Sequence, residues 1–399
     1  MSRNRRALGS ADLVIIGAGI AGLTHAAAAA RIGLSVIVVD KAAMSSGASN
    51  RGTGHLGFTA APEDQRSLSE RSRELWLELA ERSGCWIREH GATVVARSRD
   101  EQDVLDELAQ ERGARNVVAL GRVAVLERTP VRDPALVGGV WLPRDLQIDP
   151  RTALPTIAAW LAAAGVTFLW RTPVHAVEPG LVHTVRGSIN AETIVVAVDH
   201  EVDSIAGAGS TGQATPTDDG SALGRSLDFA GVHSPVVTSD MVAARSPWAG
   251  GMETPVQTAW ALAQSPGVEQ LPSARVLHRR MSAEFPELAV LGMRQTHAQR
   301  PDGTLLLGAT RLAGDGGVFH NAIVSELIVD QALTLFGIRS LRVTERWQGT
   351  TTAAIAPSLH SPADGIRVVR LPADAGMALA PAVAEQVVGS LQSVLPSRS

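Results

Sequence analysis

The chain has 399 residues, of which 45% are hydrophobic and 19% are charged, and its formal net charge is −4. This length accommodates two domains or one large composite domain with an ordinary core. The net charge predicts no attraction to nucleic acid or to anionic membranes. A single cysteine, Cys85, excludes an intramolecular disulfide and a cysteine-based metal site, so we expect a reducing, cytoplasmic environment and no metal.

The N-terminal segment has a basic start followed by an apolar stretch, residues 13–30, that resembles a signal peptide or a membrane span. Glycines interrupt the stretch and divide it into a β-branched half and an alanine-rich half. A strand at Leu13–Ile16, followed by a turn and a helix, explains this apolar stretch better than a signal peptide or a membrane span does. We expect residues 1–10 to be disordered.

The turn has the pattern G-x-G-x-x-G, formed by Gly17, Gly19 and Gly22. Gly17 permits a tight turn, Gly19 lets the backbone approach a pyrophosphate, and Gly22 lets the helix pack closely on the strand. The helix amino terminus then stabilises the phosphate charge. A second strand, residues 35–39, ends at Asp40, whose carboxylate can bind a ribose diol and would repel a 2′-phosphate. The segment therefore predicts binding of a dinucleotide other than NADP.

The residues after Asp40 favour FAD over NAD. Small hydroxyl residues and backbone amides there suit the far side of a pyrophosphate, and no second G-x-G-x-x-G of comparable quality is present for a nicotinamide cofactor. The cofactor-binding residues predicted from this part of the chain are Gly17, Gly19, Ile20, Ala21, Gly22, Asp40, Lys41, Ser46, Gly47, Ala48, Ser49 and Arg51.

Six motifs spread over most of the chain carry a resemblance to a known family. They are GASNRGTGHLG (47–57), RSRELWLELAERSGCWIREHG (71–91), LVGGVWLPRDLQIDP (136–150), DGTLLLGAT (302–310), ERWQG (345–349) and AGMALAP (375–381). With them the chain resembles the glycine/D-amino-acid oxidase (DAO) family of FAD-dependent oxidoreductases. Within that family it is most similar to a subgroup associated with aminophosphonate breakdown.

The resemblance implies an α/β fold with a split Rossmann-type FAD-binding domain and an inserted α+β substrate domain that contains an antiparallel sheet. We expect the FAD-binding domain at 11–83, 146–230 and 340–399, and the substrate domain at 84–145 and 231–339. The implied chemistry is hydride transfer from a carbon next to nitrogen to a non-covalent FAD, followed by hydrolysis of the imine. Oxygen or another acceptor would reoxidise the flavin, and the protein could be a homodimer.

The resemblance also implies further cofactor contacts. The turn at Gly54–Gly57 passes close to the flavin, Val174 offers its backbone to the adenine, and the amides of a C-terminal glycine turn meet the flavin ring. The residues added in this way are Gly54, His55, Leu56, Val174, Gly349, Ala375, Gly376, Met377 and Ala378.

Hydrophobic periodicity and turn signals place the remaining elements. Asp203–Arg225 is rich in Gly, Ser, Thr, Asp and Pro, which predicts a mobile surface loop. Residues 193–198 predict a strand that returns to the parallel sheet, and Pro301-Asp302-Gly303 closes a hairpin between 293–299 and 304–309. Helices are expected at 65–82, 101–112 and 150–164, and short strands at 167–170 and 174–177.

The sequence departs from the family in the substrate region. Relatives bind the substrate carboxylate with an Arg just after the W-x-G stretch and with a Tyr, whereas here Thr350-Thr351-Thr352 follows Gly349 and Tyr is absent. A free α-amino acid is therefore not the expected substrate, because threonines do not replace a guanidinium fork. Asp199-His200-Glu201 stands where a glycine turn usually approaches the cofactor, and we interpret it as a solvated loop and not as a metal site.

His55 lies in the turn near the flavin, where relatives usually have an apolar residue. A neutral imidazole there could accept a proton from an ammonium substrate, since an amine must be deprotonated before hydride leaves. The alternative is a histidine that hydrogen-bonds the cofactor or backbone without taking part in the chemistry.

Four residues are candidates for substrate binding: Gln295, His297, Arg311 and Trp347. In a regular strand Gln295 and His297 share one face while Arg294 and Thr296 share the other, and the sequence does not decide which face meets the substrate. Arg311 could bind an anionic group through a fork of hydrogen bonds.

These features favour FAD-dependent oxidation of a small amine, for example an aminophosphonate-like molecule or a biosynthetic intermediate. A flavin monooxygenase is the nearest alternative, but the chain lacks the Gly-Asp signature of those hydroxylases. A degenerate flavoprotein scaffold without catalysis is the second alternative, motivated by Asp199 and by the missing Arg and Tyr.

Overall fold

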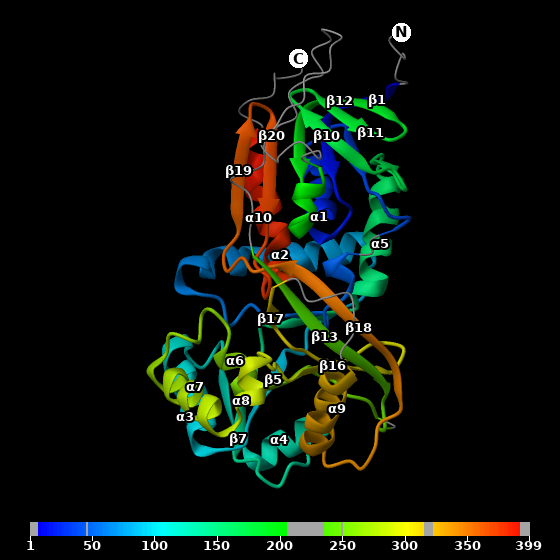
Figure 1. Ribbon diagram of the computed structural model, residues 1–399. Helices are drawn as coiled ribbons and strands as arrows, with labels where there is room; N and C mark the ends of the chain where they lie inside the picture. The colour runs from blue at the N-terminus through cyan, green and yellow to red at the C-terminus, as the bar shows by residue number, and fades with distance from the viewer. Residues whose placement is uncertain (1–6, 45–46, 206–234, 249, 315–321, 392–399) are drawn as a thin grey trace.

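The computed structural model describes residues 7–44, 47–205, 235–248, 250–314 and 322–391. Figure 1 shows an elongated molecule with two lobes. The upper lobe is built on an eight-stranded sheet and the lower lobe on a nine-stranded sheet. The predicted surface loop at Asp203–Arg225 lies largely outside the described residues.

The sheet of the upper lobe has the strand order β10-β11-β12-β1-β2-β9, with β20 beside β12 and β19 beside β20. The strands β9, β2, β1, β12 and β20 run parallel to one another, as expected for a Rossmann-type core. Strands β11 and β19 pair antiparallel with β12 and β20. The strands are β1 (Ala7–Ile16), β2 (Val36–Val39), β9 (Thr167–Leu169), β10 (Val174–Glu178), β11 (Leu181–Thr184), β12 (Gly187–Val196), β19 (Ser358–Ala363) and β20 (Ile366–Arg370).

The expected disorder of residues 1–10 requires correction. Strand β1 begins at Ala7, which pairs with Ser188, and Gly9 and Ser10 continue the parallel ladder with β12. Residues 7–10 therefore belong to the sheet, because the ladder with β12 satisfies their backbone groups. Residues 1–6 lie outside the described residues.

Four helices of the upper lobe pack against one another, and α1 contacts β1 and β2 of the sheet. Helix α10 contacts both α1 and α2, and α5 contacts α1 and α2. Trp76 of α2 is buried, and its Nε1 donates to the carbonyl of Met377 at 3.0 Å, while Ser72 Oγ donates to the carbonyl of Ala378 at 2.6 Å. These bonds fix the first turn of α10 on α2. The helices are α1 (Ile20–Arg31), α2 (Arg66–Ser83), α5 (Pro150–Ala163) and α10 (Gly376–Leu391).

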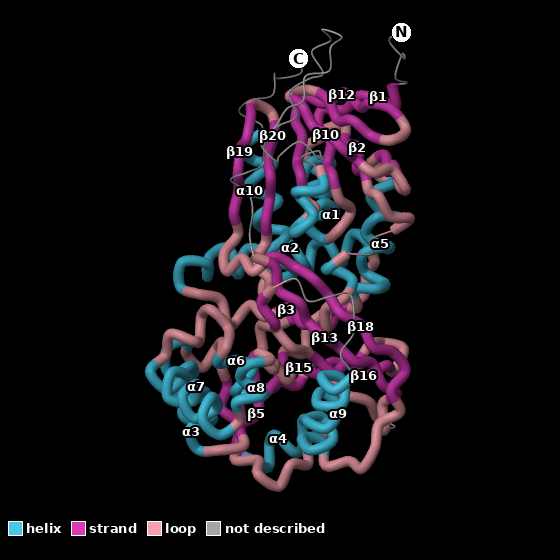
Figure 2. The backbone as a smooth tube through the Cα atoms, in the orientation of Figure 1, coloured by secondary structure: helices cyan, strands magenta, loops and turns pink. Residues whose placement is uncertain are grey.

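The sheet of the lower lobe is antiparallel except where β14 runs parallel to β5. Its order is β17-β13-β16-β15-β14-β5-β7-β6, with β18 paired to β13. Figure 2 shows β13 and β18 side by side. The hairpin of β15 and β16 forms as predicted. The strands are β5 (Ala92–Ala96), β6 (Val118–Gly121), β7 (Gly138–Leu142), β13 (Val236–Arg245), β14 (Val256–Thr258), β15 (Thr296–Gln299), β16 (Thr304–Gly308), β17 (Leu312–Ala313) and β18 (Val343–Thr352).

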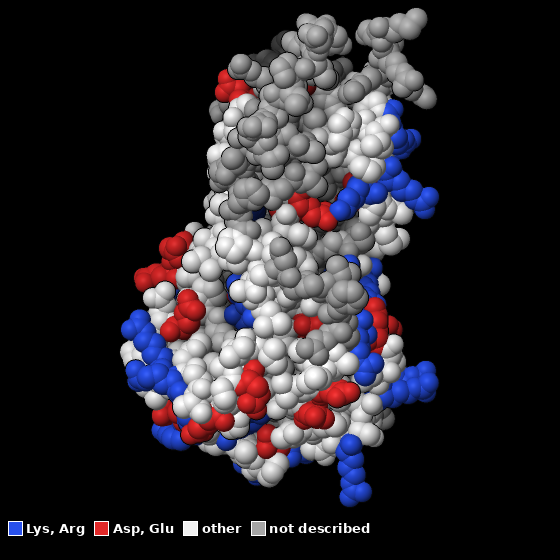
Figure 3. All heavy atoms as spheres, in the orientation of Figure 1, with Lys and Arg blue, Asp and Glu red and all other residues white. Residues whose placement is uncertain are grey.

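Helices α3, α4, α6 and α9 contact strands of the lower sheet, and α7 packs on α3 and α6. Apolar side chains of the sheet and of these helices form one buried cluster that includes Val94, Leu105 and Phe336. Figure 3 shows side chains of both charges interspersed over this lobe. The helices are α3 (Arg99–Arg112), α4 (Arg122–Arg128), α6 (Ala259–Ala263), α7 (Pro272–Glu284), α8 (Pro286–Val290) and α9 (Ala322–Phe336).

We predicted that the chain returns to the FAD-binding domain at residue 340, but the strand pairing places this return later in the chain. Strand β18 pairs along its length with β13 of the lower sheet, so the chain re-enters the upper lobe only after Thr352. A small sheet of β3 (His55–Leu56), β8 (Leu146–Ile148) and β4 (Ile87–Arg88) lies at the chain crossings between the lobes. Among the described helices, none is long and apolar enough to cross a membrane.

Candidate functional site

The loop between β1 and α1 is tight enough to require its glycines. Gly17 has a φ of +102°, and a Cβ there would lie 2.5 Å from the carbonyl oxygen of Ala197. A Cβ on Gly22 would lie 1.8 Å from the carbonyl oxygen of Gly17. Gly19 caps α1 without a side-chain hydrogen bond, so the amino end of the helix faces the cavity with backbone amides. Such an end is suited to a phosphate group.

Asp40 stabilises this loop. Its Oδ2 accepts from the amide of Ala18 and its Oδ1 from the amide of Ala42, both at 2.7 Å. Each carboxylate oxygen retains a second lone pair that can accept from a ribose hydroxyl. Lys41 instead points to Glu201, with its Nζ 2.6 Å from Oε1, and more than half of its side chain is exposed.

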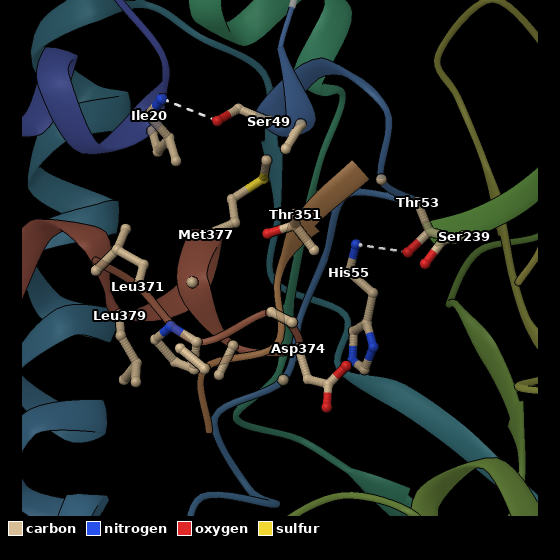
Figure 4. Close-up of a pocket in the computed structure, with 18 of the residues that line it drawn as sticks. Ile20, Ser49, Thr53, His55, Ser239, Thr351, Leu371, Asp374, Met377 and Leu379 are labelled. Carbon is tan, nitrogen blue, oxygen red and sulfur yellow. Dashed lines mark hydrogen bonds between the residues drawn. The ribbon is translucent and has the colours of Figure 1, made fainter. Parts of the chain in front are cut away.

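The segment after Asp40 approaches the start of α1 from the other side. Ser49 lies in a 3₁₀ turn, Ala48–Asn50, and its Oγ accepts from the amide of Ile20 at 3.1 Å (Figure 4). Ala48 and Arg51 line the same cavity, and Arg51 donates to the carbonyl of Gln348. This segment therefore joins the glycine loop to β18.

A cavity of about 350 Å³ lies between the lobes. Figure 4 shows Ile20 and Ser49 at one end, apolar Leu371, Met377 and Leu379 on one side, and His55, Asp374 and Thr351 around the other end. Helix α10 begins in its wall at Gly376, so a second helix amino terminus meets the cavity. The predicted cofactor residues that line it are Gly19, Ile20, Ala21, Ala48, Ser49, Arg51, Gly54, His55, Gly349, Ala375, Gly376 and Met377.

Other predicted cofactor residues do not line the cavity. Gly17, Gly22 and Asp40 shape the loop, as described above. Leu56 and Ala378 are buried in the packing of the upper lobe. The remaining ones are Lys41, Gly47 and Val174, which the cavity wall does not include, and Ser46, which lies outside the described residues.

His55 lies in the cavity wall on β3 and is paired with a buried carboxylate. Its Nε2 lies 2.9 Å from Oδ2 of Asp145, and the exposed fractions of the two side chains are 11% and 1%. Asp145 follows β7 in the chain and immediately precedes β8, the strand that pairs with β3. Asp145 was not among the predicted site residues, although it lies in the motif 136–150.

The strands β14 and β15 supply the wall on the lower-lobe side. Arg294 and Thr296 line the cavity, and Gln257 lies opposite Thr296 in the sheet and lines it too. Gln257 has an exposed fraction of 8%, and its Oε1 is buried without a hydrogen-bond partner among the described residues. A ligand donor could satisfy this acceptor.

The prediction that Gln295 and His297 contact the substrate requires correction. Gln295, just before β15, and His297 within it are both buried, outside the cavity wall and against α9. Gln295 donates to Oε1 of Gln331, and the ring of His297 lies edge-on to Phe336 with centroids 5.2 Å apart. The alternation along the strand was correct, but packing of α9 selects the face with Arg294 and Thr296 for the cavity.

Arg294 belongs to a charge cluster at the cavity. Its Nη1 lies 2.7 Å from Oδ1 of Asp374, and Arg311 contacts the other oxygen of the same carboxylate. Burial holds the pKa of Arg294 below its usual range despite Asp374, but a guanidinium remains charged at neutral pH. Two cations share one anion, so the cluster carries one net positive charge. Arg311 itself is outside the cavity wall and acts on it through Asp374.

Trp347 also lies outside the cavity wall. Its Nε1 donates to the carbonyl of Arg51 at 2.9 Å, and the guanidinium of Arg151 lies 5.0 Å from its ring centroid. These contacts give it a structural position beside the cofactor segment. Thr350 and Thr351, further along β18, line the cavity in its place.

Asp199 enters the cavity wall from the end of the upper sheet. It has a φ of +55°, unusual for a residue other than glycine, and it accepts from the amide of Thr352 at 3.3 Å. Its carboxylate raises the pKa of the neighbouring His200. Among the described residues, no three His, Cys, Asp or Glu side chains are grouped to hold a metal ion.

The site fits a dinucleotide with a flavin. The loop leaves no space for side chains at Gly17 and Gly22, two helix amino termini meet one cavity, and an antiparallel sheet closes its far end. These features define an oxidoreductase with a split Rossmann-type nucleotide domain. The chain belongs to the family described as "DAO: FAD dependent oxidoreductase", whose model matches residues 12–389.

Solved structures agree with this assignment. Glycine oxidase from Geobacillus kaustophilus has a TM-score of 0.72 at 21% identity, covering 97% of this chain and 96% of that one. L-proline dehydrogenase from P. horikoshii has a TM-score of 0.74 at 18% identity, with coverages of 98% and 95%. L-α-glycerophosphate oxidase from Mycoplasma pneumoniae, solved with FAD bound, has a TM-score of 0.72 at 17% identity, with coverages of 96% and 95%.

No curated protein matches the chain by sequence. The family match and the solved structures confirm the predicted fold class, and the family match confirms that the chain is an FAD-dependent oxidoreductase.

Proposed function

We propose that the protein oxidises a C–N bond of a small amine that also carries an acidic group, such as an aminophosphonate-like molecule. One observation carries this proposal: His55 and the positive Arg294–Asp374–Arg311 cluster line or border the same cavity as the glycine loop and the start of α10. Solved structures named for glycine and for L-proline share the fold.

The cofactor is held by the upper lobe. The amino end of α1 would stabilise a pyrophosphate, and the carboxylate of Asp40, which accepts from the amide of Ala18, would accept from a ribose hydroxyl. Ser49 holds the start of α1 by accepting from the amide of Ile20. The amino end of α10 lines the cavity, where its helix dipole would favour negative charge on a bound flavin. A bound FAD would supply the hydride acceptor for the substrate carbon.

The lower lobe binds and orients the substrate. The net positive charge of the Arg294 cluster attracts the acidic group, and the guanidinium gives it directional hydrogen bonds. The unpartnered Oε1 of Gln257 accepts from a donor of the substrate. The amine nitrogen then lies toward His55, which takes its proton before the C–H bond breaks. Apolar Leu371, Met377 and Leu379 exclude water from the other side of the cavity.

Anaerobic mixing of the purified holoenzyme with a panel of amines, followed by flavin absorption, tests this function. For each aminophosphonate, the panel includes the corresponding amino acid, the corresponding amine without an acidic group, and the corresponding hydroxy acid. Bleaching by the acid-bearing amines, without NAD(P)H, is expected. Bleaching by NAD(P)H alone would indicate the monooxygenase alternative, and no bleaching by any amine would favour the non-catalytic scaffold.

Substitution of His55 tests its part in the reaction. His55→Gln keeps a polar side chain of similar length but supplies no base, and we expect flavin reduction to slow by about 10²-fold. FAD content should remain normal, which would separate lost chemistry from lost cofactor. An unchanged reduction rate would assign His55 the purely structural role.

A further inference from the structure

Asp145 is a buried carboxylate in the wall of the cavity, with 1% of its side chain exposed. Its Oδ1 accepts from the amides of Phe58 and Thr59, each at 3.0 Å, and from Thr59 Oγ1 at 2.8 Å. Its Oδ2 lies 2.9 Å from Nε2 of His55, within hydrogen-bond distance. Three donors therefore fix the orientation of the carboxylate, and the remaining oxygen faces the imidazole.

The donors around Asp145 determine which ring nitrogen of His55 carries hydrogen. Two backbone amides and a hydroxyl converge on Oδ1, and the carboxylate of an aspartate at neutral pH can only accept hydrogen bonds. Nε2 of His55 must then be the donor. In the neutral ring the other nitrogen, Nδ1, keeps its lone pair.

The surroundings leave Nδ1 available. Within the described part of the chain it has no hydrogen-bond partner, and the His55 ring lines the cavity. The backbone amide of His55 donates to Thr53 Oγ1 at 3.4 Å, and this bond satisfies the first amide of β3 (Figure 4). On the neighbouring strand, Nε2 of Gln147 donates to the carbonyl of Gln299 at 2.8 Å, while its Oε1 is buried without a hydrogen-bond partner among the described residues.

We infer that Asp145 is a positioning residue that holds neutral His55 as the Nε2–H tautomer and presents Nδ1 to the substrate ammonium. The inference rests on the proposed amine oxidation. In the step, an N–H bond of the ammonium breaks and an Nδ1–H bond forms, with no change of oxidation state. The imidazolium produced is stabilised by the carboxylate of Asp145, as in other carboxylate–histidine pairs.

Asp145→Asn should reverse the tautomer. The same three donors would hold the amide oxygen in the place of Oδ1, so the NH₂ group would face His55 and donate to Nε2. The hydrogen would move to Nδ1, and His55 would present a donor where the substrate needs an acceptor. Thr59→Val is the matched control, because it removes one donor to Asp145 without changing the atom that faces His55.

Nitrogen-15 NMR of the holoenzyme with labelled histidines identifies the tautomer of His55 and does not require enzyme activity. The His55 signals are assigned as those that disappear in His55→Gln. We expect Nε2–H in the native protein and in Thr59→Val, and Nδ1–H in Asp145→Asn. An Nδ1–H tautomer in the native protein, or no change in Asp145→Asn, would overturn the inference. The native spectrum alone decides this point if Asp145→Asn fails to fold.

Anaerobic flavin reduction supplies the second measurement. Asp145→Asn should slow reduction by about 10²-fold, with FAD binding unchanged, and the difference should shrink above the pKa of the substrate ammonium, where no base is needed. A reversed tautomer with an unchanged rate would refute the coupling of Asp145 to proton removal. If no amine reduces even the native enzyme, the proposed function fails, while NMR still decides the role of Asp145 in setting the tautomer.

Discussion

The carboxylate of Asp374 lies 2.7 Å from Nη1 of Arg294, across the junction between the turn that starts α10 and strand β15. The ion pair therefore connects the proposed flavin-facing turn to the substrate wall. It also limits the charge that the arginine presents to the cavity.

Substitutions in this pair should change the affinity for acids in opposite directions. Arg294→Met removes a charged donor, and we expect the Kd of a non-oxidisable acid such as methylphosphonate to rise about 10- to 100-fold. Asp374→Asn removes the competing anion and should lower that Kd. Calorimetric titration of the holoenzyme measures both, with a neutral ligand of the same size as the control. Equal Kd values in the three proteins would show that the acid binds elsewhere.

Gly22→Ala should prevent FAD binding. Its Cβ would lie 1.8 Å from the carbonyl oxygen of Gly17, a backbone atom that cannot move without opening the loop. The matched control is Gly389→Ala in the last turns of α10, where a Cβ meets nothing within 4 Å. Relative to glycine, alanine there should stabilise the helix by up to about 1 kcal/mol. Flavin absorption after purification and thermal unfolding measure the two effects, and normal FAD content in Gly22→Ala would refute the packing argument.

His297→Leu should stabilise the protein, most strongly in acid. Burial, with a smaller contribution from Arg97, lowers the pKa of His297 to about 3 from an ordinary 6.5, and neither ring nitrogen has a hydrogen-bond partner among the described residues. A pKa lower in the folded state means that the unfolded state binds the proton first, so stability is complete above about pH 6.5 and declines as pH falls toward 3. At pH 5 this histidine should reduce the free energy of unfolding by about 2 kcal/mol.

Denaturant unfolding of the native protein and His297→Leu at pH 8 and pH 5 measures this difference. Flavin reduction by the substrate is the accompanying control. A normal rate is expected because His297 faces α9 and not the cavity. A lost rate with intact FAD would restore the prediction that His297 binds substrate.

Asp199→Asn should tighten FAD binding. The carboxylate lies in the wall of the cavity that also contains the start of α1, so it opposes the negative charge of a pyrophosphate. At an effective dielectric constant typical of partly buried charges, its removal should lower the Kd by about 3- to 10-fold. The effect should diminish at high salt. Titration of the apoprotein with FAD, followed by flavin fluorescence, measures it.

Asp199→Gly separates charge from backbone strain. Glycine accepts a φ of +55° without the cost that other residues incur, so this variant should match Asp199→Asn in FAD affinity and exceed it in thermal stability. A weaker affinity in both variants would mean that Asp199 supports the cofactor site through its bond to Thr352.

The cofactor end of the site could be predicted because its residues are close together in the sequence. The spacing of Gly17, Gly19 and Gly22 encodes one turn between a strand and a helix, and Asp40 ends the next strand. Local sterics fix these positions whatever the rest of the chain does. The hairpin of β15 and β16 followed from its turn residues for the same reason.

The substrate end depended on contacts between distant segments. Alternation along β15 separated Arg294 and Thr296 from Gln295 and His297, but only the packing of α9 determined which pair meets the cavity. His55 and Asp145 are 90 positions apart, and Arg294 and Asp374 are on different lobes, so no local pattern joins them. The sequence by itself determined the nucleotide loop, the enzyme family and the presence of His55 in the turn. Only the tertiary structure decided the partner that orients His55 and the charge that surrounds the substrate, because those depend on which faces are buried when the two sheets come together.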